Sequence, residues 1–101
     1  MFSSRLQNEQ TDNLARAFLA LSSMEDCYRL FEDLFTIREI QDLSQRLEVA
    51  QLLQSQATYT EIVEKTGVST ATIGRVNRAL NYGAGGYQRV LEKTAKKEAE
   101  E

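Results

Sequence analysis

A glycine placed between two helix-start signals is the feature that most constrains what this chain can fold into. The segment TYTE (58–61) has the spacing of a capping box, in which a hydroxyl and a later carboxylate bind the free amides of a helix start. Gly67 ends that helix, because glycine readily adopts the left-handed conformation found after helix ends. Ser69 is a good N-cap for the next helix. The pattern predicts helices over about 59–65 and 70–81, joined by the short glycine turn of a helix-turn-helix.

Apolar residues on both predicted helices are expected to hold this turn closed. The second helix carries them at helical spacing, which marks one face of an amphipathic helix. This face and the valine of the turn must pack against the apolar residues of the first helix, and glycine allows the sharp turn that the packing needs. The residues expected to meet are Ile62, Val63, Val68, Ile73, Val76 and Leu80.

The rest of the second helix presents small, short polar and basic side chains. Small residues permit close approach to a DNA groove, hydroxyls bond bases or phosphates, and arginine can bind guanine or a phosphate through two hydrogen bonds. A glycine inside a helix costs about 0.8–1 kcal/mol relative to alanine. Gly74 therefore indicates a close contact, either with DNA or with another helix of the domain. The surface consists of Thr70, Ala71, Gly74, Arg75, Asn77, Arg78 and Asn81.

Charge is distributed along the chain in a way that favours DNA as the partner. The net charge of the whole chain is −3, which argues against a general polyanion binder. The segment 66–91, however, contains three arginines and no acidic residue, whereas the rest of the chain carries nine basic and fifteen acidic residues. A plain helical hairpin with solvated arginines would fit the same spacing, and the absence of acidic residues from this segment counts against it.

The remaining sequence also follows helical spacing, so the expected fold class is all-α. Ser23 and Thr36 are good N-caps for two helices, and the second of these can reach about 18 residues because the chain contains no proline. A last helix is expected over about 87–97, before a tail, 96–101, that has no apolar face and is expected to fray. The apolar sides of the helices outside the helix-turn-helix comprise Leu14, Ala17, Phe18, Leu21, Cys27, Leu30, Phe31, Leu34, Ile37, Ile40, Leu43, Leu47, Ala50, Leu53, Tyr87, Val90 and Leu91.

Length and composition limit the function further. A chain of 101 residues predicts one domain, 1–101, and association into a dimer would offset the poor surface-to-volume ratio of so small a fold. No stretch approaches the roughly 18 apolar residues of a membrane span, and the N-terminus lacks a signal core, so a cytoplasmic protein without membrane contact is expected. Cys27 is the only cysteine and histidine is absent, so we expect no metal site, no catalytic residue and no enzyme activity.

Two segments, RLEVAQLL (46–53) and TYTEIVEKTGVSTATIGRVNRALNYG (58–83), resemble the Trp-repressor superfamily, most closely its YerC/YecD-type group. The likeness covers about residues 12–92. It implies six helices and an intertwined homodimer, with a shared core over about 12–54 and 86–97 and a helix-turn-helix over about 58–81. With the N-cap Ser69, and with Arg78 from the surface described above, the expected contacts to double-stranded DNA come from Tyr59, Thr60, Ser69, Thr70, Ala71, Thr72, Gly74, Arg75, Arg78 and Asn81.

The resemblance also implies an effector pocket between the core and the helix-turn-helix, where the Trp repressor binds L-tryptophan. Val76 stands where that repressor has a glycine beside the indole, and Ala79 stands where a serine receives the amino group. The added volume and the lost hydroxyl predict that L-tryptophan is not the effector. Arg46 and Arg75 then either bind another anion or pair with acidic neighbours such as Asp42. No other cofactor is expected, and the pocket positions are Thr36, Arg46, Thr72, Arg75, Val76 and Ala79.

The leading function is thus a sequence-specific DNA-binding transcriptional regulator that binds a two-fold operator as a dimer, with repression expected only by family analogy. The alternative is a helical interaction module whose helix-turn-helix binds a protein partner. The net charge of −3 and the modest basic surface of the second helix keep this alternative open.

Overall fold

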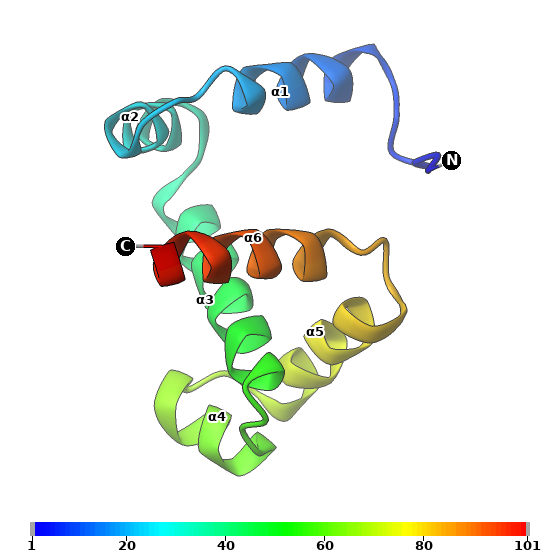
Figure 1. The fold of residues 1–101 in the computed structure, drawn as a ribbon, viewed down its shortest axis with the longest axis vertical. Helices are drawn as coiled ribbons and strands as arrows, with labels where there is room; N and C mark the ends of the chain where they lie inside the picture. The colour runs from blue at the N-terminus through cyan, green and yellow to red at the C-terminus, as the bar shows by residue number, and fades with distance from the viewer. Residues whose placement is uncertain (1, 101) are drawn as a thin grey trace. The chain divides into compact units, whose positions relative to one another are not determined.

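The computed structural model describes residues 2–100, and side chains up to residue 97. The regular structure in this range is entirely helical (Figure 1). The helices follow the predicted order, and none of those within residues 2–100 is long and apolar enough to cross a lipid bilayer. The elements are α1 (Glu9–Leu19), α2 (Met24–Leu34), α3 (Ile37–Gln54), α4 (Tyr59–Thr66), α5 (Thr70–Tyr82) and α6 (Gly86–Glu100).

The ends of the helices differ from the predicted ends by a few residues. α1 stops at Leu19, so Leu21 lies beyond the helix whose apolar side it was expected to extend. α6 continues to Glu100 rather than ending near Lys97. The tail expected to fray is therefore helical as far as Glu100, while residue 101 and the side chains from 98 onward lie outside the described residues. Local signals thus locate the elements well, and their last turns less well.

Contacts divide the chain into two compact units, one ending at Ile37 and the other beginning at Arg38. The first unit contains α1 and α2. Ser23 caps α2 as predicted, because its Oγ accepts a hydrogen bond from the Asp26 amide at 3.1 Å. Phe18 and Phe35 lie with ring centroids 6.2 Å apart, and Cys27 is half-buried.

None of the described side chains of α1 and α2 is buried. Leu14, Phe18 and Leu34, which lie on the apolar sides predicted for these helices, are all exposed in the single chain. Both helices are amphipathic, yet two short helices alone cannot enclose their own apolar stripes. The apolar face of this unit is left open.

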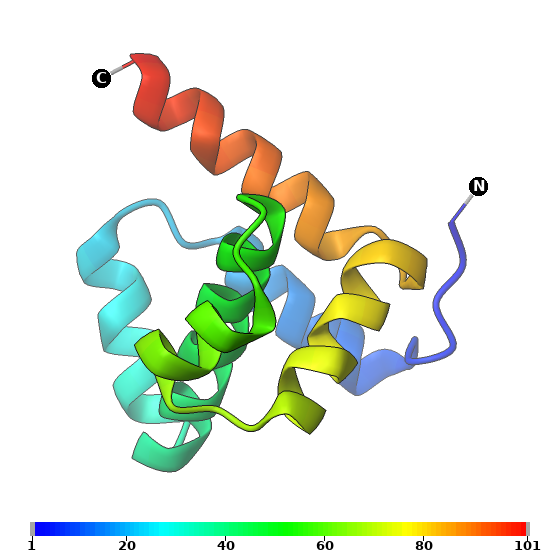
Figure 2. The ribbon, with the colours of Figure 1, turned by 90° about the horizontal axis from the view of Figure 1, so that it is seen from below.

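The second unit contains the buried core of the described chain. α5 packs against both α4 and α6. Figure 2 shows α4 and α5 joined by the short turn and α6 leaving the far end of α5. The predicted packing of α5 and the turn onto α4 is confirmed. The buried residues are Val49, Ala50, Ile62, Val68, Ile73, Val76, Leu80 and Leu91, with Leu52, Leu53, Ala57, Val63 and Tyr87 packed against them.

The predicted apolar face of α3 is only partly correct. Ala50 is buried as expected, but Leu43 and Leu47 are exposed, and the fully buried Val49 was not among the expected residues. The end of α3 that joins the helix-turn-helix core supplies the buried pair, Val49 and Ala50. On α6 the same difference appears, because Leu91 is buried whereas Val90 is half exposed. Helical spacing predicts which side of a helix is apolar, but it does not predict how much of that side a neighbouring element covers.

Candidate nucleic-acid interface

The start of α4 is held by the predicted capping box. The Glu61 amide donates to Thr58 Oγ1 at 3.2 Å, and the Thr58 amide donates to Glu61 Oε1 at 3.1 Å. Hydrogen bonds that the Glu61 carboxylate accepts, from the Thr58 backbone amide first and the Thr58 side chain second, lower the pKa of this carboxyl below its usual value because they favour the ionised form. The helix start is therefore stabilised most strongly when Glu61 is charged.

The turn between α4 and α5 has the predicted glycine geometry. Gly67 has φ +75° and its amide donates to the Val63 carbonyl, which closes α4. Thr66 adds a contact that the sequence did not predict, since its hydroxyl donates to the Ile62 carbonyl at 2.7 Å and lies 3.3 Å from the Val68 amide, which donates to it. Glycine conformation and one threonine together set the angle at which the chain enters α5.

α5 begins at the predicted cap. The Ser69 Oγ accepts a hydrogen bond from the Thr72 amide at 3.2 Å and donates to the Thr72 hydroxyl at 3.1 Å. Ile73, Val76 and Leu80 are buried, as their spacing predicted. The inner stripe of α5 is thus fixed against the core, which determines the side of the helix that faces outward.

The predicted DNA contacts lie at the start of α4 and along the outer side of α5. Most of these side chains are exposed, and Thr72 and Gly74 are half-buried. An alanine Cβ built at Gly74 would meet no atom within 4 Å, so the alternative in which this glycine packs against another helix of the domain is wrong for the described residues. The exposed members are Tyr59, Thr60, Ser69, Thr70, Ala71, Arg75, Arg78 and Asn81.

Asn81 differs from the other predicted contacts because its side chain is already engaged. Its Nδ2 donates to both the Asn77 carbonyl and the Asn77 Oδ1, each at 2.9 Å. The amide therefore lies back along its own helix. Its remaining Oδ1 is an acceptor, and an acceptor cannot bond a phosphate oxygen.

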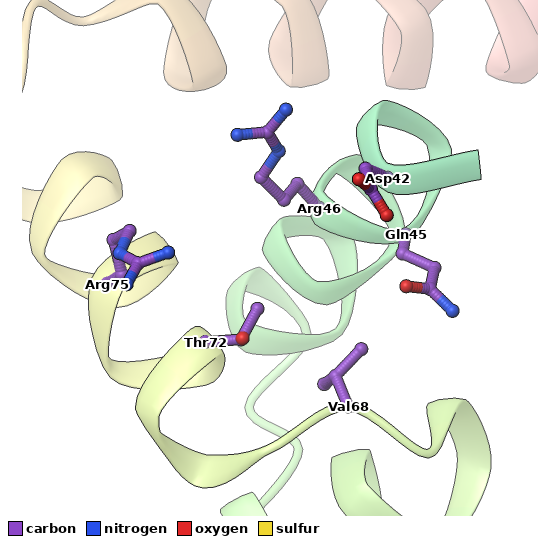
Figure 3. Close-up of a pocket in the computed structure, with 6 residues that line it drawn as sticks. All are labelled: Asp42, Gln45, Arg46, Val68, Thr72 and Arg75. Atoms are coloured by element: carbon purple, nitrogen blue, oxygen red, sulfur yellow. The ribbon is translucent and has the colours of Figure 1, made fainter. Parts of the chain in front are cut away.

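A cavity of about 320 Å³ lies between α3 and the start of α5, lined by three of the predicted effector positions (Figure 3). Arg46 comes from α3, while Thr72 and Arg75 come from α5. Neither arginine forms an ion pair or hydrogen bond with any side chain that the structure describes. Asp42 pairs instead with Arg38, at 3.7 Å from Nε to Oδ1, so the alternative in which Asp42 pairs with the cavity arginines is wrong. The lining residues are Asp42, Gln45, Arg46, Val68, Thr72 and Arg75.

The other predicted pocket positions are not brought to this cavity. Val76 is 2% exposed and belongs to the core. Ala79 is exposed on α5, outside the lining. Thr36 belongs to the first unit, so it is not placed relative to the cavity. Gln45 and Val68 also line the cavity, although the sequence did not predict them as pocket residues. Gln45 could have been found from its position one residue before Arg46 and three residues after Asp42 on one helix.

The family model for the Trp repressor protein matches residues 9–95. The chain belongs to the Trp repressor family. It is 48% identical over 96 residues to the uncharacterized protein YerC of Bacillus subtilis, covering 95% of this chain and 92% of YerC. Family membership suggests a DNA-binding regulator, and the family's members are regulators rather than enzymes.

Two solved structures of the family share the fold. A TrpR-like protein from Eubacterium eligens superposes with a TM-score of 0.85 at 50% identity, over 90% of this chain and 94% of that one. A protein from Staphylococcus aureus, described as a candidate Trp repressor, superposes with a TM-score of 0.85 at 43% identity, over 90% of this chain and 91% of that one. The all-α Trp-repressor-like fold predicted from the sequence is confirmed.

Proposed function

We propose that this Trp repressor family member is a sequence-specific transcriptional repressor that binds double-stranded DNA through α5. The observation that carries the proposal is the outer side of α5. This side combines exposed arginines with small residues, lacks acidic groups, and contains a glycine that nothing in the described chain requires. A recognition helix needs close approach to the groove and donors for base edges and phosphates, and this surface supplies both.

We infer that the chain acts as a homodimer on a two-fold operator. The support is the open apolar face of α1 and α2, where Leu14, Phe18 and Leu34 are exposed although they lie on the apolar sides of their helices. Exposed apolar patches of this kind mark interaction surfaces in soluble proteins. A dimer would present two copies of α5 to half-sites about one helical turn apart.

The test begins with selection of bound duplexes from a random library, followed by titration of the enriched duplex at several salt concentrations. Arg75→Ala and Arg78→Ala are each expected to weaken binding about tenfold or more, because each removes a charged donor from the outer side of α5. Arg29→Ala, on α2, is the matched control for the loss of one positive charge. Unchanged affinity in both α5 variants would contradict the proposal.

Gly74→Ala separates DNA contact from folding. Because the added Cβ meets nothing within 4 Å, the variant should be more stable by up to about 1 kcal/mol, as expected for alanine in a helix. The same methyl group would stand between the helix and the DNA, so affinity for the enriched duplex should fall. A stabilised variant with wild-type affinity would show that Gly74 does not approach DNA.

We infer that L-tryptophan is not the effector of the cavity between α3 and α5. Of the lining residues only Val68 is apolar, whereas Arg46 and Arg75 are charged and have no described partner. An indole ring in this setting would face polar groups that it cannot satisfy, while a small anion would meet two guanidinium groups. The expected result is that L-tryptophan leaves the affinity for the enriched duplex unchanged, and a tryptophan-dependent increase would contradict the inference.

One observation favours a second candidate function, a helical module that binds a protein partner. The outer side of α5 carries only two arginines, and the chain has a net charge of −3. A protein that shows no retention on duplex DNA at low salt but forms a stable complex with another protein would support this second function.

A further inference from the structure

The outer side of α5 ends in an aromatic side chain that the proposed DNA contacts do not include. Tyr82 is the last residue of α5 and is 89% exposed. We propose that its hydroxyl donates a hydrogen bond to a DNA phosphate at the edge of the groove that α5 enters. This inference rests on the proposed function, because it extends the DNA surface of the same helix.

Helical geometry places Tyr82 in line with the centre of the proposed DNA surface. Ala71, Arg78 and Tyr82 recur at seven and four residues, which are positions on one side of an α-helix. All three are exposed, and the opposite side of α5 carries its buried stripe. The line extends about 16 Å at 1.5 Å per residue. If Ala71 lies near the bases, Tyr82 on the same side of α5 therefore lies near the DNA backbone that flanks them.

Tyr82 is better suited than Asn81 to make the contact at this end of the helix. The amide of Asn81 donates twice to Asn77, so it offers only an acceptor to the outside. The Tyr82 hydroxyl forms no hydrogen bond with any described group and is free to donate. A phosphate oxygen accepts hydrogen bonds and cannot donate them, so only the tyrosine matches it.

The chain that follows Tyr82 leaves the ring uncovered and holds the helix end in place. Residues 83–86 are Gly, Ala, Gly and Gly, so no long side chain can fold back over the ring. The Gly83 amide donates to the Ala79 carbonyl at 3.0 Å, and a Cβ at Gly83 would collide with that carbonyl oxygen. The Gln88 side chain also donates to the Leu80 carbonyl at 2.9 Å. The phenol is therefore presented from an ordered helix end.

A neutral donor suits the C-terminal end of a helix. This end has a partial negative charge from its unpaired carbonyls and so gives no help to a phosphate, unlike the N-terminal end. Contact with the DNA backbone here must come from a side chain that donates a hydrogen bond, and the exposed Tyr82 can donate one without adding charge. The contact should therefore contribute affinity without releasing counterions, which distinguishes it from the arginine contacts.

The experiment compares Tyr82→Phe and Tyr82→Ala with the wild-type chain on two probes. These are the duplex enriched from a random library and a 30-base-pair duplex of mixed sequence, each titrated over a range of salt concentrations. Tyr82→Phe should weaken binding about tenfold or more on both probes, as expected for the loss of a hydrogen bond to a charged group. The slope of log affinity against log salt should stay unchanged in Tyr82→Phe and should fall by about 1 in Arg78→Ala if Arg78 contacts a phosphate.

Tyr28→Phe is the matched control, because it removes the same hydroxyl from an exposed tyrosine on α2. It should bind both probes as the wild type does. Wild-type affinity in Tyr82→Phe, together with weakened binding in Arg78→Ala, would overturn the role of Tyr82 and leave the proposed function intact. Loss of binding in Tyr82→Ala but not in Tyr82→Phe would also overturn it, since the ring alone would then make the contact. A wild-type chain that binds neither probe would overturn the proposed function itself.

Discussion

The two units of this chain differ in how they treat apolar side chains that follow the same helical spacing. The second unit encloses its stripes, and Ile62 and Ile73 are completely buried. The first unit encloses none, and Leu34, on the apolar side of α2, is 47% exposed. Both units have good N-caps and amphipathic helices. The difference therefore comes from the number of neighbouring elements, not from the quality of the individual helices.

This contrast indicates different roles for the two units: the second unit orients α5, and the first unit provides an interaction surface. Three helices and a tight turn pack around α5, so the orientation of the proposed DNA surface is set within one chain. Two short helices cannot enclose their own apolar face, and an exposed apolar face of this kind marks an interaction surface. In the proposed dimer, a second copy of the chain covers the apolar face of α1 and α2.

The largest effect is expected from Ile73→Ala. This side chain is 0% exposed at the centre of the second unit, so its truncation leaves a cavity and should lower the free energy of unfolding by about 2–5 kcal/mol. Urea denaturation followed by circular dichroism measures the change. Leu19→Ala, in the first unit, should stay within about 0.5 kcal/mol of wild type. Equal losses in the two variants would show that the first unit is covered to the same degree as the second.

The next effect concerns assembly. Phe18 is 41% exposed and lies on the open face of the first unit, so Phe18→Asp would place a charge in the proposed dimer interface. The dimer dissociation constant, measured by analytical ultracentrifugation, should rise by more than about tenfold. The midpoint of thermal unfolding should depend on protein concentration in the wild type and less so in the variant. A wild-type chain that sediments as a monomer at every concentration would contradict the dimer.

A smaller effect is expected at two residues with left-handed backbone conformations in the second unit. Gly67 has φ +75° and Gln56 has φ +71°, so each ends a helix in a conformation that glycine adopts most easily. Gly67→Ala should destabilise the chain by about 1 kcal/mol, whereas Gln56→Gly should stabilise it by about 0.5–1 kcal/mol. Thermal unfolding of both variants measures whether each change lowers or raises the stability of the chain. A loss of stability in Gln56→Gly would mean that the Gln56 side chain makes compensating contacts.

The smallest effect is a difference between the capping boxes of the two units in how their contribution to stability depends on pH. Glu61 has a pKa lowered by Thr58, so its contribution is complete above the ordinary carboxyl pKa and is lost as the pH falls through the lowered value. The equivalent box in the first unit pairs Asn8 with Thr11, and neither group titrates in this range. Glu61→Gln should therefore show a shallower loss of stability in acid than wild type. Identical pH profiles for the two chains would count against a titrating box.

The sequence predicted the parts of the fold that depend on neighbours along the chain. The Thr58–Glu61 box, the Gly67 turn and the Ser69 cap were all predicted and are all present, because each needs groups only three or four residues apart. The buried stripe of α5 was predicted for the same reason. The predictions failed where the outcome depends on distant elements: Leu43 and Leu47 are exposed, and Val49 is buried.

The candidate site shows the same limit. Arg46, Thr72 and Arg75 were predicted to line a pocket, and the structure brings them to one cavity. Val76 was predicted for the same pocket but is buried in the core. The pairing of Asp42 with Arg38, in contrast, is a local contact within one helix at a spacing of four residues.

The sequence by itself determined where the helices start, where the chain turns and which side of α5 is apolar, since caps, glycine conformation and helical period are local properties. Only the tertiary structure decided which apolar stripes are covered and which polar side chains remain free. It enclosed Val49 and left Tyr82 exposed. Burial and free hydrogen-bonding groups depend on segments that are distant in the chain, and spacing along the sequence does not specify those contacts.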